Sequence, residues 1–257
     1  MRKAKWVCGV IAGWIVLGGM SLGAAEIKSH AEAVNMMGKE RMLVMRILKD
    51  MVMVGMKMDY HNPEEDLKKT IATFEETQQA LKAYVKDPKI QAKLKEIDAK
   101  WTQARELLAE PPQKERAQEY LKTMVGIREL ANDATNMMSG GAEDGASLTI
   151  NLAGRLRAVS QALASVYLLD TWGMEGARKK LEIPMKRFRG SLDHLEKAPV
   201  TDEKAKKLLG RLEKTYLFFQ VMKDSETFTP TLVVSKTDRM FKDAAKLTQH
   251  YVELLKK

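Results

Sequence analysis

Two stretches of the chain repeat one arrangement of polar and small residues. The pattern N-x-x-G-x-x-R occurs as Asn35, Gly38 and Arg41, and again as Asn151, Gly154 and Arg157. An arginine guanidinium is always charged and presents a planar fork of donors, which suits a planar oxyanion. A glycine one turn earlier lets a helix or a ligand approach closely. An asparagine another turn back could supply an amide donor.

The other reactive side chains predict no catalytic site. The four histidines are scattered, with no H-x-x-x-H or E-x-x-H pair that would suit a metal. After the expected signal peptide, no serine lies in a G-x-S-x-G turn, and no glycine-rich loop could cradle a phosphate. We therefore expect a protein that is not an enzyme and has neither a cofactor nor a metal site.

A methionine cluster leaves one alternative open. Met51, Met53, Met56 and Met58 lie close together beside His61. Thioether groups can bind Cu(I) in exported proteins. Methionine also fills irregular cores, and at helical spacing these four side chains divide between two faces. Core packing is the favoured interpretation, and copper binding is the alternative.

The elements that carry these residues are predicted to be helices throughout. Prolines fall between long amphipathic segments with apolar residues at spacings of three and four, and no strand-like alternation occurs. Pro184 is an exception inside a segment, and should kink that helix or mark its true start. The predicted helices span residues 27–60, 64–85, 89–109, 113–138, 147–171, 176–197, 202–224 and 230–256.

The sequence predicts that the eight helices form an internal repeat of two four-helix units. Aromatic landmarks follow both motifs in the same order and at a nearly constant offset, Phe74 with Phe188 and Trp101 with Tyr216. Short turns favour antiparallel up-and-down packing. We therefore predict an all-α protein of two tandem antiparallel four-helix bundles, in which the first and fifth helices run parallel about a pseudo-twofold axis. The bundles span 26–138 and 147–257, with a linker at 139–146.

The N-terminus resembles an export signal. Basic residues precede an apolar stretch that is shorter than the roughly 20 residues of a membrane span, and small residues follow it. We expect residues 1–25 to be a cleaved signal peptide that removes Cys8, the only cysteine. The net charge is +9 over the whole chain and has no concentrated basic stripe, so nucleic acid is not an expected partner. The expected compartment is the periplasm.

The stretches around Arg41 and Arg157 resemble the signature of a sensor domain. It is the periplasmic N-terminal domain of type IV pilus methyl-accepting chemotaxis transducers (PilJ-type), shared with nitrate/nitrite sensor kinases (NarX-type), with the pattern I-N-x-A-G-x-x-R-M-L-S-Q-R. In the kinases the motif arginines of two first helices hold one nitrate between them. The resemblance thus implies a small anion, nitrate or nitrite, as the ligand. The implied ligand-binding residues are Arg41, Arg157, Gly38, Gly154, Asn35 and Asn151.

Both motifs depart from the family pattern. The first has Val44, Met45 and Arg46 where the family has S-Q-R, whereas the second keeps Ser160 and Gln161 but loses the second arginine. These departures leave open that only one copy binds. The resemblance implies a sensory protein that signals to a membrane receptor such as a histidine kinase or chemotaxis transducer. The alternative is a structural bundle that docks a periplasmic partner without a small ligand, and a homodimer is possible in either case.

Overall fold

The computed structural model describes residues 27–140, 145–225 and 227–255, and this part of the chain is helical with no strand. The prediction of an all-α fold with eight helices is confirmed. The expected signal peptide, Cys8 and half of the expected linker lie outside the described residues. The α-helices are α1 (His30–Gly55), α2 (Pro63–Tyr84), α3 (Pro88–Leu108), α4 (Ala117–Met138), α5 (Gly145–Thr171), α6 (Glu182–Lys197), α7 (Glu203–Met222) and α8 (Pro230–Leu254). Short 3-10 helices, η1 (Lys114–Arg116) and η2 (Arg178–Leu181), precede α4 and α6.

Helix starts follow from capping residues and prolines. Asn62 and Asp87 each accept a backbone N–H of the following first turn, and a proline comes next in both α2 and α3. Pro184 lies in the first turn of α6, so it marks a start rather than a kink. The predicted range 176–197 was too long at its beginning because η2 occupies part of it.

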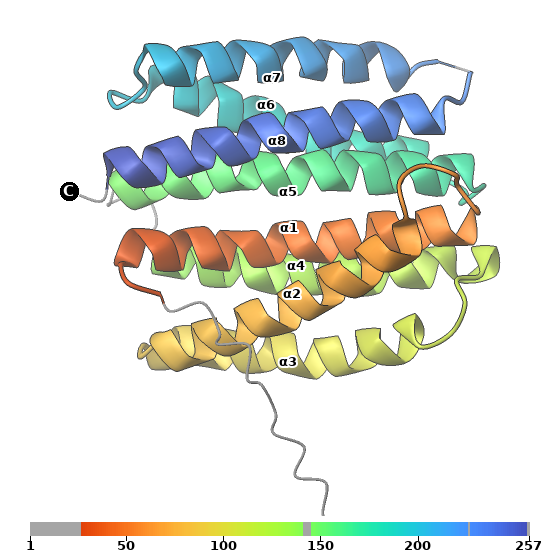
Figure 1. Ribbon diagram of the computed structural model, residues 1–257, viewed down its shortest axis with the longest axis horizontal. Coiled ribbons are helices and arrows are strands. Elements are labelled where there is room, and N and C mark those ends of the chain that lie inside the picture. Colours follow the sequence, from red (N-terminus) through yellow and green to blue (C-terminus); the bar gives the residue numbers. More distant parts are fainter. Residues whose placement is uncertain (1–26, 141–144, 226, 256–257) are drawn as a thin grey trace, which may run out of the picture.

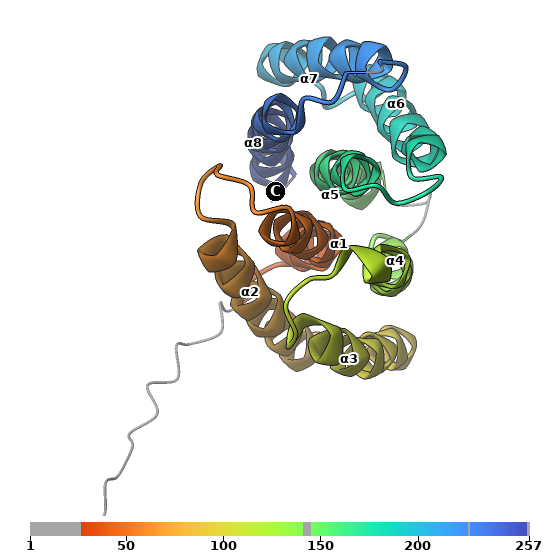
Figure 2. The ribbon, with the colours of Figure 1, turned by 90° about the vertical axis from the view of Figure 1, so that its right-hand side faces the viewer.

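Two parallel helices form the centre of the molecule. Helices α1 and α5 run side by side in the same direction and pack along their length (Figure 1). Helices α2–α4 cover one side of α1, and α6–α8 cover the opposite side of α5 (Figure 2). Seen along α1 and α5, α4 and α6 lie on one flank of the central pair, while α2 and α8 lie on the other.

Apolar side chains form one continuous core through all eight α-helices. The aromatic landmarks of the sequence meet inside it: the rings of Phe74 and Trp101 join α2 to α3 with centroids 4.3 Å apart, and those of Phe188 and Tyr216 stack at 5.7 Å between α6 and α7. Among the described helices, none combines the length and the apolar character that a bilayer crossing requires.

Candidate anion-binding site beside the central helix pair

The two sequence motifs meet across the α1–α5 interface. Nη1 of Arg41 donates to the side-chain oxygen of Asn151 at 2.8 Å, and its Nη2 donates to the Asn151 carbonyl at 3.2 Å. In the opposite direction, Nη2 of Arg157 donates to the carbonyl of Asn35 at 3.3 Å. Each motif arginine therefore reaches across to the asparagine of the other motif.

The motif glycines leave the space that the two guanidinium groups occupy. A Cβ on Gly38 would lie 2.9 Å from Nη2 of Arg41 and 3.7 Å from Nη2 of Arg157. A Cβ on Gly154 would lie 3.2 Å from Nη2 of Arg157 and 3.4 Å from Nη2 of Arg41. Both Nη2 atoms thus lie close to the same two points, and the like charges are too close for salt to screen them.

Burial makes both charges costly. Arg41 is 2% exposed and Arg157 8%. Burial holds the pKa of Arg41 well below its ordinary 12.5, and the neighbouring arginines lower it further. Burial also lowers the pKa of Arg157 to about 10. An arginine side chain keeps its proton in proteins. The Nε atom of each of these two arginines has no hydrogen-bond partner within the described part of the chain.

A cavity of about 220 Å³ opens beside Arg41, between α4, α5 and α6. Asn132 of α4 lines it and accepts a hydrogen bond from Nη1 of Arg41 at 3.1 Å. Three arginines from different helices also line it: Arg128 of α4, Arg155 of α5 and Arg187 of α6. We call Arg41, Arg128, Arg155 and Arg187 the arginine cluster. The sequence motif includes only Arg41, and Arg157 is not among the lining residues.

Positive charge exceeds negative charge in the arginine cluster. Glu129 forms ion pairs with both Arg128 and Arg187, with 3.0 Å between Nη2 of Arg187 and Oε1 of Glu129. Arg155 has no hydrogen bond or ion pair with any described residue, and burial and the charge of Arg187 lower its pKa. Burial lowers the pKa of Arg128 to about 10. Four guanidinium groups with one carboxylate create a field that favours an anion.

The surroundings of the two motif arginines differ. Lys39 precedes Arg41 at the position that Arg155 takes before Arg157. Burial lowers the pKa of Lys39, and the charge of Arg157 lowers it further. The motif offset of 116 residues leads from Asn132 to Thr248 on α8, whose hydroxyl donates to the Ala244 carbonyl at 2.8 Å. The cavity with several arginines is therefore built on the Arg41 side.

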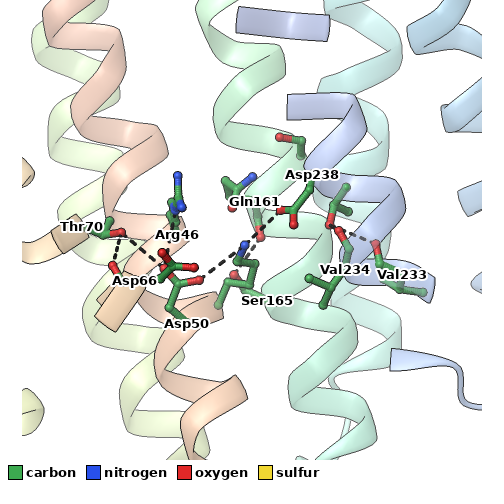
Figure 3. A network of polar contacts seen from close by, with 12 residues as sticks. Arg46, Asp50, Asp66, Thr70, Gln161, Ser165, Val233, Val234 and Asp238 are labelled. Atoms are coloured by element: carbon green, nitrogen blue, oxygen red, sulfur yellow. Dashed lines mark hydrogen bonds and ion pairs between the residues drawn. The ribbon is translucent and has the colours of Figure 1, made fainter. Parts of the chain in front are cut away.

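A second polar cluster crosses the opposite flank, between α1, α2 and α8 (Figure 3). Nζ of Lys49 lies 3.1 Å from Oδ1 of Asp238 and 3.4 Å from Oδ1 of Asp50. Thr70 donates to Asp50 at 3.3 Å, and Nε of Arg46 lies 3.6 Å from the same carboxylate. Burial raises the pKa of Asp50, and the neighbouring cations partly oppose this. Two cations face two carboxylates here, so this cluster fastens helices together and has no surplus charge to attract an ion.

The methionine cluster supports core packing. Met51 and Met53 are buried, and Met56 and Met58 pack against the core. Within the described residues, no group of three or more histidine, cysteine or acidic side chains could hold a metal ion. The burial of Met51 and Met53 favours core packing, and copper binding through thioethers stays the alternative prediction.

In a comparison with known protein families, one family matches part of the first half of the chain. Residues 24–125 match the family described as type IV pili methyl-accepting chemotaxis transducer N-term, PilJ. The match includes the motif of Arg41 and ends before α5, so it covers less than half of the chain. No curated protein and no solved structure matches the chain. It stays a prediction that the second half of the chain resembles this family and that either half resembles nitrate sensor kinases. Residues 24–125 match a PilJ domain, a sensory domain of chemotaxis transducers.

Proposed function

We propose that the chain is a periplasmic sensory protein that binds a small oxyanion beside the α1–α5 pair and presents this state to a membrane receptor. The observation that carries the proposal is the arginine cluster, in which four guanidinium groups surround one cavity and Glu129 alone pairs with two of them. The PilJ match supports a sensory role. Nitrate and nitrite are the first ligands to test, because the sequence motif resembles that of nitrate sensors.

Arg41 is the central ligand-binding residue of this proposal. It lies at the meeting point of the motif pair and the cavity, and its hydrogen-bond partners among the described residues are neutral groups on Asn132 and Asn151. The guanidinium group of Arg157 adds a second positive charge close to Arg41, because both groups lie in the space that Gly38 and Gly154 leave open. An anion would relieve repulsion between these charges and draw α4, α5 and α6 towards α1, a movement that a receptor could read.

A binding panel tests the proposal. Nitrate, nitrite, sulfate, phosphate and acetate are compared by thermal shift and calorimetry on the mature chain. We expect at least one anion to raise the melting temperature by mass action. Each charge-assisted hydrogen bond should contribute about 1.5–3 kcal/mol, so Arg41→Gln or Arg155→Gln should weaken binding by roughly tenfold or more. Arg41→Lys keeps the charge but loses the fork, and should also weaken binding.

Arg239→Gln is the matched control, because Arg239 is exposed on α8, away from the arginine cluster. Anion binding that survives both Arg41→Gln and Arg155→Gln would place the site elsewhere. If no anion binds, the sensory proposal loses its ligand, and a docking module becomes the better explanation. One feature favours that second function: Leu217 and Val221 on α7 are apolar yet 50% and 72% exposed.

A further inference from the structure

An apolar groove of about 620 Å³ lies between α4 and α6 and is distinct from the polar cavity of the arginine cluster. Its volume is typical of a small-molecule pocket, for which about 300–1,000 Å³ is usual. Apart from buried Arg128, the charged and amide side chains of its lining are exposed: Gln118, Glu119, Lys122 and Lys180. Its apolar lining includes Met45 of α1, Ala162 and Val166 of α5, Leu121 and Val125 of α4, and Ile183 of α6.

The groove and the arginine cluster are neighbours that share a wall. Arg128 lines both the groove and the cavity. On α5, Ala158 and Val159 line the cavity, and Ala162 and Val166 line the groove. Ala158, Ala162 and Val166 recur at a spacing of four, so they form one apolar face of α5 that passes from the cavity into the groove.

We propose that the ligand is an amphipathic anion. Its charged head group lies in the arginine cluster, and its apolar chain lies along α5 in the groove between α4 and α6. This inference rests on the proposed anion site and names the class of molecule that the site takes. The charge arrangement selects this occupant: guanidinium groups gather at one end of an apolar channel, and a carboxylate, sulfate or phosphate on a hydrocarbon chain matches that order.

The side chain of Ile183 supports an apolar occupant. It is 56% exposed at the groove wall, although a large aliphatic side chain gains free energy when it is covered. Buried Met45 of α1 closes the groove at its base, so a chain in the groove would contact the central helix that also carries Arg41. One molecule would thereby touch α1, α4, α5 and α6 together.

A series of chain lengths with one head group tests the inference. Acetate, hexanoate, octanoate and decanoate are titrated by calorimetry below their aggregation concentrations, with decyl sulfate as a second head group and decanol as a chain without charge. Affinity should rise with length, by up to about fourfold for each methylene that is fully buried. Decanol should bind far more weakly than decanoate, and decyl sulfate should bind as decanoate does.

Two substitutions separate the head group from the chain. Ile183→Asn should reduce the affinity for decanoate but not for acetate or nitrate, whereas Arg128→Gln should reduce all three. Leu217→Asn is the matched control, since Leu217 is a comparably exposed apolar residue on α7 that does not line the groove. Light scattering before and after decanoate addition should show no change in oligomeric state.

Any result that differs from these expectations contradicts a specific part of the proposal. Nitrate or acetate binding without any gain from chain length overturns the amphipathic ligand and leaves the small-anion proposal in place. Failure of every anion, long or short, overturns both. Decanol binding as tightly as decanoate shows that the arginine cluster does not hold the head group. An unchanged gain in affinity with chain length in Ile183→Asn shows that the hydrocarbon chain lies elsewhere. A dimer that dissociates on adding decanoate would assign the groove to a second copy of the chain.

Discussion

Glu40 is a fully buried carboxyl group on α1, one residue before the central arginine. Neither of its oxygens has a hydrogen-bond partner among the described residues. Burial raises its pKa well above the ordinary 4.5, although the charge of Lys39 opposes part of this rise. Because the folded protein binds this proton more tightly than the unfolded chain does, stability falls as the pH rises above about 4.5.

Glu40→Gln should accordingly stabilise the protein at pH 7 and have little effect at pH 4. Between the ordinary and the raised pKa, its advantage should grow by up to about 1.4 kcal/mol per pH unit. Chemical denaturation at pH 4, 5, 6 and 7 measures this trend. Glu106→Gln, at an exposed position of α3, is the control and should show no trend. If Glu40→Gln stabilises the protein equally at all four pH values, the pKa of Glu40 is not raised in the folded protein.

At the scale of elements, small residues decide how closely helices approach. Gly55 ends α1, where a Cβ would lie 2.4 Å from the Trp172 ring and 3.1 Å from Pro112. A ring and a proline cannot move aside as a flexible side chain can. The C-terminal end of α1 therefore packs beneath the loops that follow α3 and α5 only because this position lacks a side chain.

Gly55→Ala should destabilise the fold by about 1–3 kcal/mol, a typical cost of overpacking. Gly210→Ala is the matched comparison, because a Cβ there meets nothing within 4 Å in the middle of α7. It should stabilise by about 0.5–1 kcal/mol, since alanine favours a helix more than glycine does. Urea unfolding of both variants gives the difference, and a neutral Gly55→Ala would show that Trp172 can move.

The sequence predicts the motif pair better than the cavity beside it. Equal motifs on two parallel helices were enough to expect Arg41 near Arg157, because spacing along a helix is regular. Arg128 and Arg187 come from helices whose rotation about their own axes depends on tertiary packing, so no motif marks them. Helix ends also need tertiary information: α1, expected to reach residue 60, ends at Gly55, and Lys57 follows with a φ of 52°.

At the scale of the whole molecule, the two halves share one core. Buried apolar residues of α1 and α5 belong to the same cluster, and Ser165 of α5 donates to the Met45 carbonyl of α1 at 2.8 Å. Because neither half covers its own central helix completely, we expect both to unfold together. We propose that residues 26–138 and 147–257 are two duplicated bundles. Joint unfolding of the two halves would be compatible with a duplication and with its absence.

Calorimetry of residues 26–257 should therefore show one transition. Phe188→Ala removes a fully buried ring from α6 in the second half, and should lower the stability of the whole molecule by about 3–5 kcal/mol. The single transition should move to lower temperature without splitting. Two separate transitions, of which only one responds to the substitution, would mean that the halves unfold independently.

The one-sided arginine cluster has a consequence for binding stoichiometry. In a symmetric dimer of identical units, every side chain occurs twice, so a cavity away from the axis also occurs twice. Here Lys39 and Thr248 lie at the motif offset of 116 residues from Arg155 and Asn132, and neither supplies an arginine or an asparagine for a second cavity. In one covalent chain the two flanks can therefore differ. One flank has the ligand cavity, and the ion pairs of Lys49 with Asp50 and Asp238 join the helices of the other. Saturation should come at one molecule per chain, with a Hill coefficient of one.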